Sequence, residues 1–198
     1  MTPESRSNYG DVENFVGGAW RAPSGDDGQS LTNPATGEEI GYVGFSTASD
    51  VDEAVAAGQA AFEEWRQTPV EERIQPLFAY KDLLEENQED LARLLVEDHG
   101  KTLDEARGEL RRGIENVEAA CGAPTLLQSG HVQHAAPGID ETAVRQPLGV
   151  FAAITPFNFP GMIPLWFLPY AVATGNAFIL KPSEQDPLVP RRLIDLAD

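Results

Sequence analysis

The most restrictive feature of this sequence is a run without a single charged residue, which extends from Gln146 to Leu180 and ends at Lys181. The 198-residue chain carries 32 acidic and 14 basic residues in all, so a stretch this long without charge indicates a buried segment with polar groups at its edge. A membrane-spanning helix needs roughly 20 consecutive apolar residues. The run also contains prolines that would remove backbone hydrogen bonds from such a helix, at positions 156, 160, 164 and 169. We therefore expect no membrane insertion.

Turn residues divide the run into a strand, a loop, a helix and a second strand. The expected segments are a strand over 149–155, a turn over 156–160, a kinked helix over 162–174 and a strand over 177–180. Neither strand alternates apolar with polar residues, which favours a parallel pair covered on both faces. The sequence thus predicts an α/β fold, whose ligands bind at the carboxyl ends of the strands.

Polar residues gather where the first of these strands ends. Thr155, Phe157 and Asn158 follow it, and Asn158 carries the only side-chain amide in the turn. An aldehyde attacked by a nucleophile becomes a tetrahedral oxyanion, and a fixed amide donor stabilises that charge. Asn is also common in tight turns, so support of the turn is the alternative role.

Lys181 and Glu184 follow the second strand. An ammonium group at the edge of a sheet can reach ribose hydroxyls or a phosphate, and a carboxylate three residues later can accept from a pair of ribose hydroxyls. The two together indicate an adenosine site. Taken singly, Lys181 is a solvated lysine at a strand end, and Glu184 is an acid beside Ser183 at a helix N-terminus.

Four short motifs in this part of the chain resemble the aldehyde dehydrogenase superfamily. They are Pro-Phe-Asn-Phe-Pro at 156–160, Lys-Pro-Ser-Glu at 181–184, Ile-Pro-Leu-Trp at 163–166 and Arg-Gly-Ile-Glu-Asn-Val-Glu at 112–118. The usual first motif has Trp where this chain has Phe157, and the Phe form resembles the methylmalonate-semialdehyde dehydrogenase branch. That branch oxidises malonate and methylmalonate semialdehydes to acyl-CoA. The resemblance runs from about Phe15 to the last residue.

The resemblance implies a role for each residue at the two strand ends. Asn158 corresponds to the oxyanion donor, Lys181 and Glu184 to the contacts with the adenine ribose, and Thr155 and Phe157 to cofactor contacts made through the loop backbone. A carboxylate at Glu184 would repel a 2′-phosphate, which favours NAD over NADP. CoA is implied as the co-substrate, and no metal is predicted.

Arg112 is the candidate for binding the substrate. It lies in a segment with helical character from Leu103 to about Ala119, and a guanidinium matches the geometry of a carboxylate. The resemblance implies that Arg112 binds the substrate carboxylate, so the substrate is expected to be a short acid with an aldehyde group. The alternative is a residue that balances charge on an acidic helix.

The nucleophile that the family uses is not recognisable in this chain. Oxidation of the aldehyde needs a thiolate that attacks the carbonyl. The only thiol, Cys121, has no Lys or His beside it in the sequence, and we interpret it as a buried structural cysteine. The Gly-Gln-x-Cys and Glu-Leu-Gly-Gly contexts of the family's nucleophile and general base do not occur.

The remaining sequence indicates a scaffold in four parts. Residues 1–10 are predicted to be a flexible tail, 11–129 a β-hairpin and helical part of the cofactor-binding domain, 130–146 bridging strands, and 147–198 an incomplete first β-α-β unit of the NAD-binding sheet. Short strand-like runs are expected over 15–20 and 40–45, around a turn at 33–37. Helices are expected over 50–66, 71–87 and 89–97, with Gly100 as a stop signal. Apolar residues at helical spacing, which include Val51, Ala54, Val55, Phe62 and Phe78, are expected to face a core. The resemblance implies that the 130–146 excursion pairs with a neighbouring subunit, so that the full-length form is a homo-oligomer.

These observations lead us to expect a truncated chain, because a helix begins near Pro190 with no strand after it and two parallel strands bury their faces poorly. The favoured hypothesis is the N-terminal part of an NAD-dependent semialdehyde dehydrogenase, inactive on its own. Two alternatives remain: a non-catalytic remnant that binds nucleotide or pairs with a complete subunit, and a membrane-associated protein.

The composition limits the setting and the partners. The formal net charge is −18, and only three of the basic residues are lysines: Lys81, Lys101 and Lys181. Molar salt screens such self-repulsion, so the sequence favours a salt-loving cytoplasm, with an ordinary acidic protein as the alternative. A single cysteine and the lack of a hydrophobic leader agree with a cytoplasmic location. A nucleic-acid partner is disfavoured because no basic surface is available to neutralise phosphates.

Overall fold

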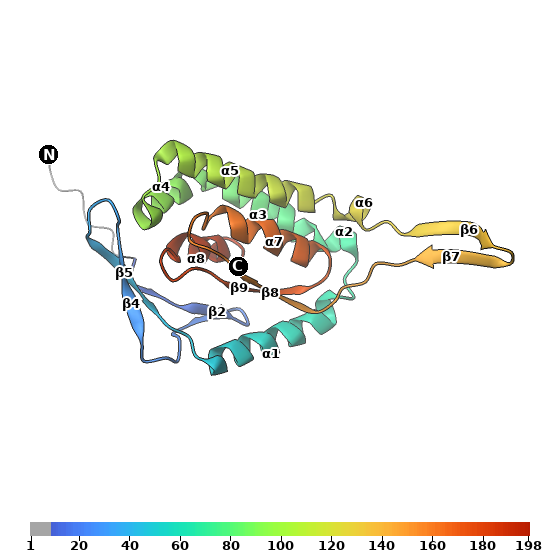
Figure 1. Cartoon of the computed structure of the whole chain (residues 1–198), viewed down its shortest axis with the longest axis horizontal. Coiled ribbons are helices and arrows are strands. Elements are labelled where there is room, and N and C mark those ends of the chain that lie inside the picture. Colours follow the sequence, from blue (N-terminus) through green and yellow to red (C-terminus); the bar gives the residue numbers. More distant parts are fainter. Residues whose placement is uncertain (1–8) are drawn as a thin grey trace.

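The structure is a computed structural model that describes residues 9–198. Helices form a layer over one side of the C-terminal β-α-β unit, helix α1 lies on the other side, and a β-hairpin projects away at one end (Figure 1). The strands are β1 (Asp11–Val12), β2 (Asn14–Val16), β3 (Ala19–Arg21), β4 (Gly28–Thr32), β5 (Glu39–Gly44), β6 (Gly130–Ala136), β7 (Ile139–Ala143), β8 (Val150–Ile154) and β9 (Ala177–Lys181). The helices are α1 (Ala48–Trp65), α2 (Val70–Arg73), α3 (Gln75–Glu86), α4 (Gln88–His99), α5 (Leu103–Ala120), α6 (Ala123–Leu126), α7 (Met162–Ala173) and α8 (Leu188–Asp195).

The N-terminal strands form two small sheets. One has the order β1-β5-β4, with β1 parallel and β4 antiparallel to β5, and the other is the β2-β3 hairpin. The turn predicted between β4 and β5 is present, because the Gly37 amide donates to the Asn33 carbonyl at 2.8 Å and Gly37 has a φ of +72°. A strand-like run predicted over 15–20 is in fact the β2-β3 hairpin, since Gly17 and Gly18, both with positive φ, reverse the chain there.

The predicted tail falls largely outside the described residues, since residues 1–8 are not described. The last two residues of that predicted tail are attached to β5. The Tyr9 amide donates to the Ile40 carbonyl at 2.8 Å, and the Gly10 carbonyl accepts from the Tyr42 amide at 3.1 Å.

Helix α1 begins earlier than its sequence predicts. Thr47 is the N-cap, and Asp50 is the third residue of a capping box, whose carboxylate accepts from the Thr47 amide at 2.7 Å. The helix was expected to bury Val51 together with Ala54, Val55 and Phe62, but Val51 is 55% exposed. The stripe of α1 that faces β8 and β9 therefore begins one turn after Val51.

The main hydrophobic core lies between α3, α4, α5 and α7. Its fully buried side chains include Leu84, Leu91, Leu95, Leu110, Ile114 and Leu165. Helix α4 ends at Gly100, which has a φ of +86° and confirms the predicted stop. Phe78, which was predicted to face the core, is 47% exposed on the outer side of α3.

The C-terminal segment folds as the predicted parallel unit. Strands β8 and β9 pair in parallel from Val150–Ala177 to Ile154–Lys181, with α7 as the crossover helix. Helix α7 contacts one face of the pair and α1 the other (Figure 1). Asn176 closes the open end of the unit, because its side-chain oxygen accepts from the Leu148 and Gly149 amides at 2.7 and 3.0 Å.

The charge-free run is less buried than its composition indicates. Phe151 and Ile154 of β8 are 41% and 82% exposed, and Trp166 and Phe167 of α7 are 42% and 48% exposed. The free edge of β8 and the outer face of α7 are therefore uncovered apolar surfaces among the described residues. The expectation that both faces of this sheet are fully covered is therefore wrong: β9 is only partly covered along residues 177–180, and Phe151, Ala152 and Ile154 of β8 are exposed.

The hairpin of β6 and β7 confirms the extended segment predicted over 130–146. It reverses at Pro137 and Gly138, where Gly138 has a φ of +78°, and it extends away from the helical layers (Figure 1). Along residues 9–198, none of the helices combines the length and the apolar character that crossing a membrane would require.

Candidate functional site

The carboxyl ends of β8 and β9 lie side by side, as the sequence predicts. The Thr155 amide donates to the Lys181 carbonyl at 3.0 Å, which continues the strand pairing by one residue. Thr155 itself is 4% exposed, and its hydroxyl oxygen is buried with no hydrogen-bond partner among the described residues. The turn after β8 and the segment after β9 therefore start side by side, from buried Thr155 and exposed Lys181.

Asn158 lies exposed in the turn between β8 and α7. Its side-chain amide makes no hydrogen bond with any of residues 9–198, whereas its backbone carbonyl accepts a hydrogen bond of 2.6 Å from the Lys101 ammonium. The turn is thus held through the backbone of Asn158. The side-chain amide is left available as a donor to a group outside the protein. Phe157, the preceding residue, is 50% exposed.

Lys101 and Glu109 attach this turn to helix α5. The Lys101 ammonium forms an ion pair with the Glu109 carboxylate and lies 4.2 Å from the centre of the Phe159 ring. Glu109 is 4% exposed, and its second oxygen accepts from the Gly161 and Met162 amides at 2.8 and 3.1 Å. Those amides belong to the first turn of α7, whose free N–H groups favour a negative charge.

Lys181 and Glu184 form an exposed ion pair at the end of β9. Their Nζ and Oε2 atoms are 3.0 Å apart, and more than two fifths of each side chain is accessible. Backbone hydrogen bonding at Glu184, followed by the hydrogen bond from Lys181, holds the pKa of the Glu184 carboxyl below its usual value. The Glu184 carbonyl also accepts from the Gln29 side chain at 2.8 Å, which fastens this segment to β4.

Arg112 is exposed on α5, and its side chain forms no ion pair or hydrogen bond within the part of the chain that the structure describes. Its neighbour Arg111 pairs with three carboxylates, those of Glu85, Glu115 and Glu118. The ion pairs on this part of α5 are therefore made by Arg111. No hydrogen bond or ion pair joins the Arg112 and Asn158 side chains, so the role of Arg112 in binding a substrate stays a prediction.

Cys121 follows the last turn of α5 and is 8% exposed. Burial, followed by the charge of Glu118, raises the pKa of its thiol. A thiol that resists ionisation is a poor nucleophile, which agrees with a structural role. Among residues 9–198, no group of His, Cys, Asp and Glu side chains is placed to hold a metal ion.

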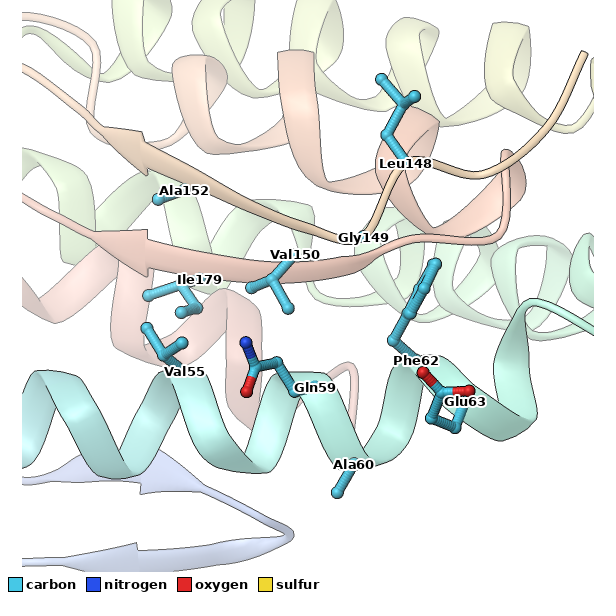
Figure 2. Close-up of a pocket in the computed structure, with 10 residues that line it drawn as sticks. All are labelled: Val55, Gln59, Ala60, Phe62, Glu63, Leu148, Gly149, Val150, Ala152 and Ile179. Atoms are coloured by element: carbon cyan, nitrogen blue, oxygen red, sulfur yellow. The ribbon is translucent and has the colours of Figure 1, made fainter.

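A cavity of about 750 Å³ lies between α1 and the first half of β8. Figure 2 shows Val55, Gln59 and Phe62 of α1 pointing toward Val150 and Ile179 of the strands. None of the six predicted site residues lines it. Its lining reaches along the strands only to Ala152 of β8 and Ile179 of β9, short of the ends that carry Thr155 and Lys181.

Sequence reasoning missed Lys101 and Glu109. The signal available for Lys101 was weak: it is one of three lysines and follows the glycine that ends α4. Nothing in the sequence distinguishes Glu109 from the other acids of α5, because its burial depends on the approach of α7.

A family model for the aldehyde dehydrogenase family matches residues 20–198. The chain therefore belongs to the aldehyde dehydrogenase family. This confirms the resemblance that the four motifs carry.

Within this family the chain is similar to semialdehyde dehydrogenases. It is 48% identical over 185 residues to malonate-semialdehyde dehydrogenase 1 of Geobacillus kaustophilus. The matched residues make up 93% of this chain and 38% of that protein. A structure described as a methylmalonate-semialdehyde dehydrogenase of Sinorhizobium meliloti, in complex with NAD, matches with a TM-score of 0.91 and 42% identity over 98% of this chain and 39% of the other. The methylmalonate-semialdehyde dehydrogenase of Oceanimonas doudoroffii matches with a TM-score of 0.87 and 45% identity, over 92% and 37% of the two chains. This chain thus spans less than two fifths of the length of these relatives.

Proposed function

We propose that this chain supplies the oxyanion-binding and adenosine-binding part of an NAD-dependent aldehyde dehydrogenase that acts on malonate or methylmalonate semialdehyde. The observation that carries this proposal is the joined pair of strand ends, where the free Asn158 amide and the exposed Lys181–Glu184 pair lie on either side of the Thr155–Lys181 hydrogen bond. The names of the similar proteins supply the substrate class.

Asn158 would act on the aldehyde oxygen. Its side-chain amide has no partner among residues 9–198, and the turn that carries it is held by Lys101 through the backbone. A donor fixed in this way loses little freedom when charge develops on the oxygen, which is the condition for electrostatic stabilisation of a tetrahedral oxyanion. Removal of one such donor slows acyl-transfer chemistry by about 100- to 1000-fold in other enzymes.

NAD is the cofactor that the strand ends fit. The side chains of Lys181 and Glu184 are both exposed, so the hydroxyls of an adenine ribose can accept from the ammonium group and donate to the carboxylate without any rearrangement of buried residues. The lowered pKa of Glu184 keeps its carboxylate charged at neutral pH, and that charge would repel the 2′-phosphate of NADP. When bound, NAD accepts the hydride that leaves the substrate carbon.

Arg112 would bind the carboxylate of the semialdehyde, and CoA would take the acyl group. Support for Arg112 comes from its exposed guanidinium and its lack of an ion pair among the described residues. Such a group offers a two-pronged hydrogen bond to a carboxylate. CoA is proposed from the resemblance to the methylmalonate-semialdehyde branch.

A second candidate function is a non-catalytic one, in which the chain binds nucleotide or pairs with another subunit. The observation that favours it is the buried Cys121, since this sequence contains neither the Gly-Gln-x-Cys nor the Glu-Leu-Gly-Gly context. The β6-β7 hairpin, which projects from the rest of the chain, would provide the contact with a neighbouring subunit of a cytoplasmic homo-oligomer (Figure 1).

Two measurements on the purified chain test these functions. Calorimetric titration should show that NAD binds and that NADP binds more weakly, whereas equal or absent binding of both would contradict the cofactor proposal. NADH formation with malonate semialdehyde and CoA should be undetectable for this chain alone. Turnover that disappears in Cys121→Ala would show that Cys121 is a nucleophile and would overturn its structural interpretation.

A further inference from the structure

Four groups in and after the Asn158 turn are held by a single lysine and its partner acid. Lys101 donates to the Asn158 carbonyl, lies over the Phe159 ring, and pairs with Glu109, which in turn accepts from the amides at the start of α7. The turn is therefore attached at its tip to the segment that joins α4 to α5, through Lys101, and at its far end to helix α5, through Glu109.

We infer that Lys101 is a positioning residue, which fixes the backbone of Asn158 so that its side-chain amide faces away from the protein. This inference rests on the proposed function of Asn158 as the oxyanion donor. Lys101 itself does not touch the substrate and acts through the Asn158 carbonyl.

The positioning role of Lys101 differs from the capping of helix α7, which Glu109 performs. Glu109 alone satisfies the Gly161 and Met162 amides, and its side chain is 1% exposed. A buried carboxylate needs a nearby cation, which Lys101 provides. An ammonium group has three donors, and Lys101 directs a second one to the Asn158 carbonyl at 2.6 Å. Capping of α7 requires the acid, but only the lysine reaches the tip of the turn.

Packing between α5 and α7 makes the arrangement rigid. A side chain at Gly161 would approach Leu110 Cδ2 to 3.0 Å and Glu109 Oε1 to 3.3 Å. Because Gly161 has no side chain, helix α7 can lie close enough to α5 for the Glu109 carboxylate to reach its first amides. With the start of α7 fixed in this way, the tip of the turn is the part whose position depends on Lys101.

The test uses the double variant Lys101→Met with Glu109→Gln, since the single change Lys101→Met would leave a buried charge without a partner. The side-chain oxygen that remains after Glu109→Gln can still accept from the two amides of α7, so the cap is retained while the link to Asn158 is lost. Lys101→Arg is the conservative variant, because a guanidinium can still bridge an acid and a carbonyl. Lys81→Met is the matched control, since it removes an exposed pair with Glu85 on α3.

Two measurements are made on each variant: the 15N relaxation of the Asn158 and Phe159 amides, and the affinity for NAD. In the double variant we expect order parameters to fall from about 0.85 to below about 0.6. We expect the affinity for NAD to fall about tenfold, because the charge-assisted hydrogen bond from Lys101 to the Asn158 carbonyl is lost. That bond orders the turn whose backbone at Phe157 is proposed to contact the cofactor. Lys101→Arg and Lys81→Met should keep wild-type values within about threefold.

Unchanged order parameters at Asn158 and Phe159 in the double variant would overturn the inference. A turn that is equally mobile in the double variant and in Lys81→Met would also overturn it, because the loss of order would then not come from the contact with Lys101. If the native chain does not bind NAD but the double variant loosens the turn, the proposed cofactor fails and the positioning of the Asn158 backbone by Lys101 is upheld.

Discussion

The backbone amide of Thr155 donates to the backbone carbonyl of Lys181 at 3.0 Å, and this contact joins the two strand ends that carry every cofactor residue we propose. This hydrogen bond continues the parallel register of β8 and β9, whose last pair is Ile154 with Lys181. Substitutions on either side of this contact should therefore affect one site rather than two.

Glu184→Gln should reduce discrimination against NADP. The substitution removes the negative charge that faces the proposed ribose site and breaks the ion pair with Lys181, while it keeps a side-chain oxygen. We expect the ratio of NAD to NADP affinity to fall about tenfold, with little effect on the melting temperature, because an exposed pair contributes about 0–1 kcal/mol. Calorimetry with both nucleotides measures this ratio. An unchanged ratio would show that Glu184 does not face the 2′ position.

Gly113→Ala should destabilise the chain relative to Gly108→Ala on the same helix. A side chain at Gly113 would meet Leu165 Cδ1 at 2.7 Å, whereas Gly108 has nothing within 4 Å. The gain in helix propensity is the same at both positions, at roughly 1 kcal/mol. Overpacking at Gly113 should make the two free energies of unfolding differ by about 1–3 kcal/mol. Equal values from urea denaturation would show that α5 and α7 do not pack this closely.

The free energy of unfolding should fall as the pH rises from about 4 to about 8. Burial raises the pKa of Asp98 to about 7, and burial together with the charge of Asp98 raises that of Asp186 to about 8. Because both carboxyls hold protons more tightly in the folded chain than in the unfolded one, the folded state binds more protons in this range and loses stability as they ionise. Denaturation at several pH values and constant ionic strength measures the slope.

Asp186→Asn should flatten that slope, and Asp104→Asn should not, because the Asp104 side chain is 94% exposed. One oxygen of Asp186 is buried without a hydrogen-bond partner among the described residues, so an uncharged amide is expected to be tolerated there. A slope that is equal in all three proteins would assign the pH dependence to the general acidity of the chain.

Potassium chloride should stabilise the chain up to molar concentrations. The net charge of −18 creates repulsion that is only partly screened at 0.1 M salt, where the Debye length is about 10 Å, and is screened further at 1 M, where it is about 3 Å. The melting temperature should rise between 0.1 and 2 M salt. A plateau below about 0.2 M would favour an ordinary acidic protein over a salt-adapted one.

The sequence predicts the C-terminal β-α-β unit well because its signals are local. Pro156 and Pro160 mark the turn, and uninterrupted apolar residues mark the strands on either side of α7. The exposure of Ile154 was not predictable in this way, since apolar composition indicates that a strand favours burial but not whether a neighbouring element covers it.

The candidate site could be predicted only in part for the same reason. Asn158 and Lys181 each follow an apolar strand in the sequence, so the sequence alone identifies them as strand-end residues. Lys101 and Glu109 reach the turn from a different segment, so their role depends on the packing of α5 against α7. A lone sequence has no local pattern that reports such a contact.

The most direct test of the proposed site is a map of amide chemical shifts as NAD is added to 15N-labelled chain. We expect the largest changes at Thr155, Phe157 and Asn158 and at Lys181 and Glu184, the residues on either side of the joined strand ends. Changes confined to Gln59 and Val150, which line the cavity beneath β8, or no changes at millimolar NAD, would contradict the proposed site.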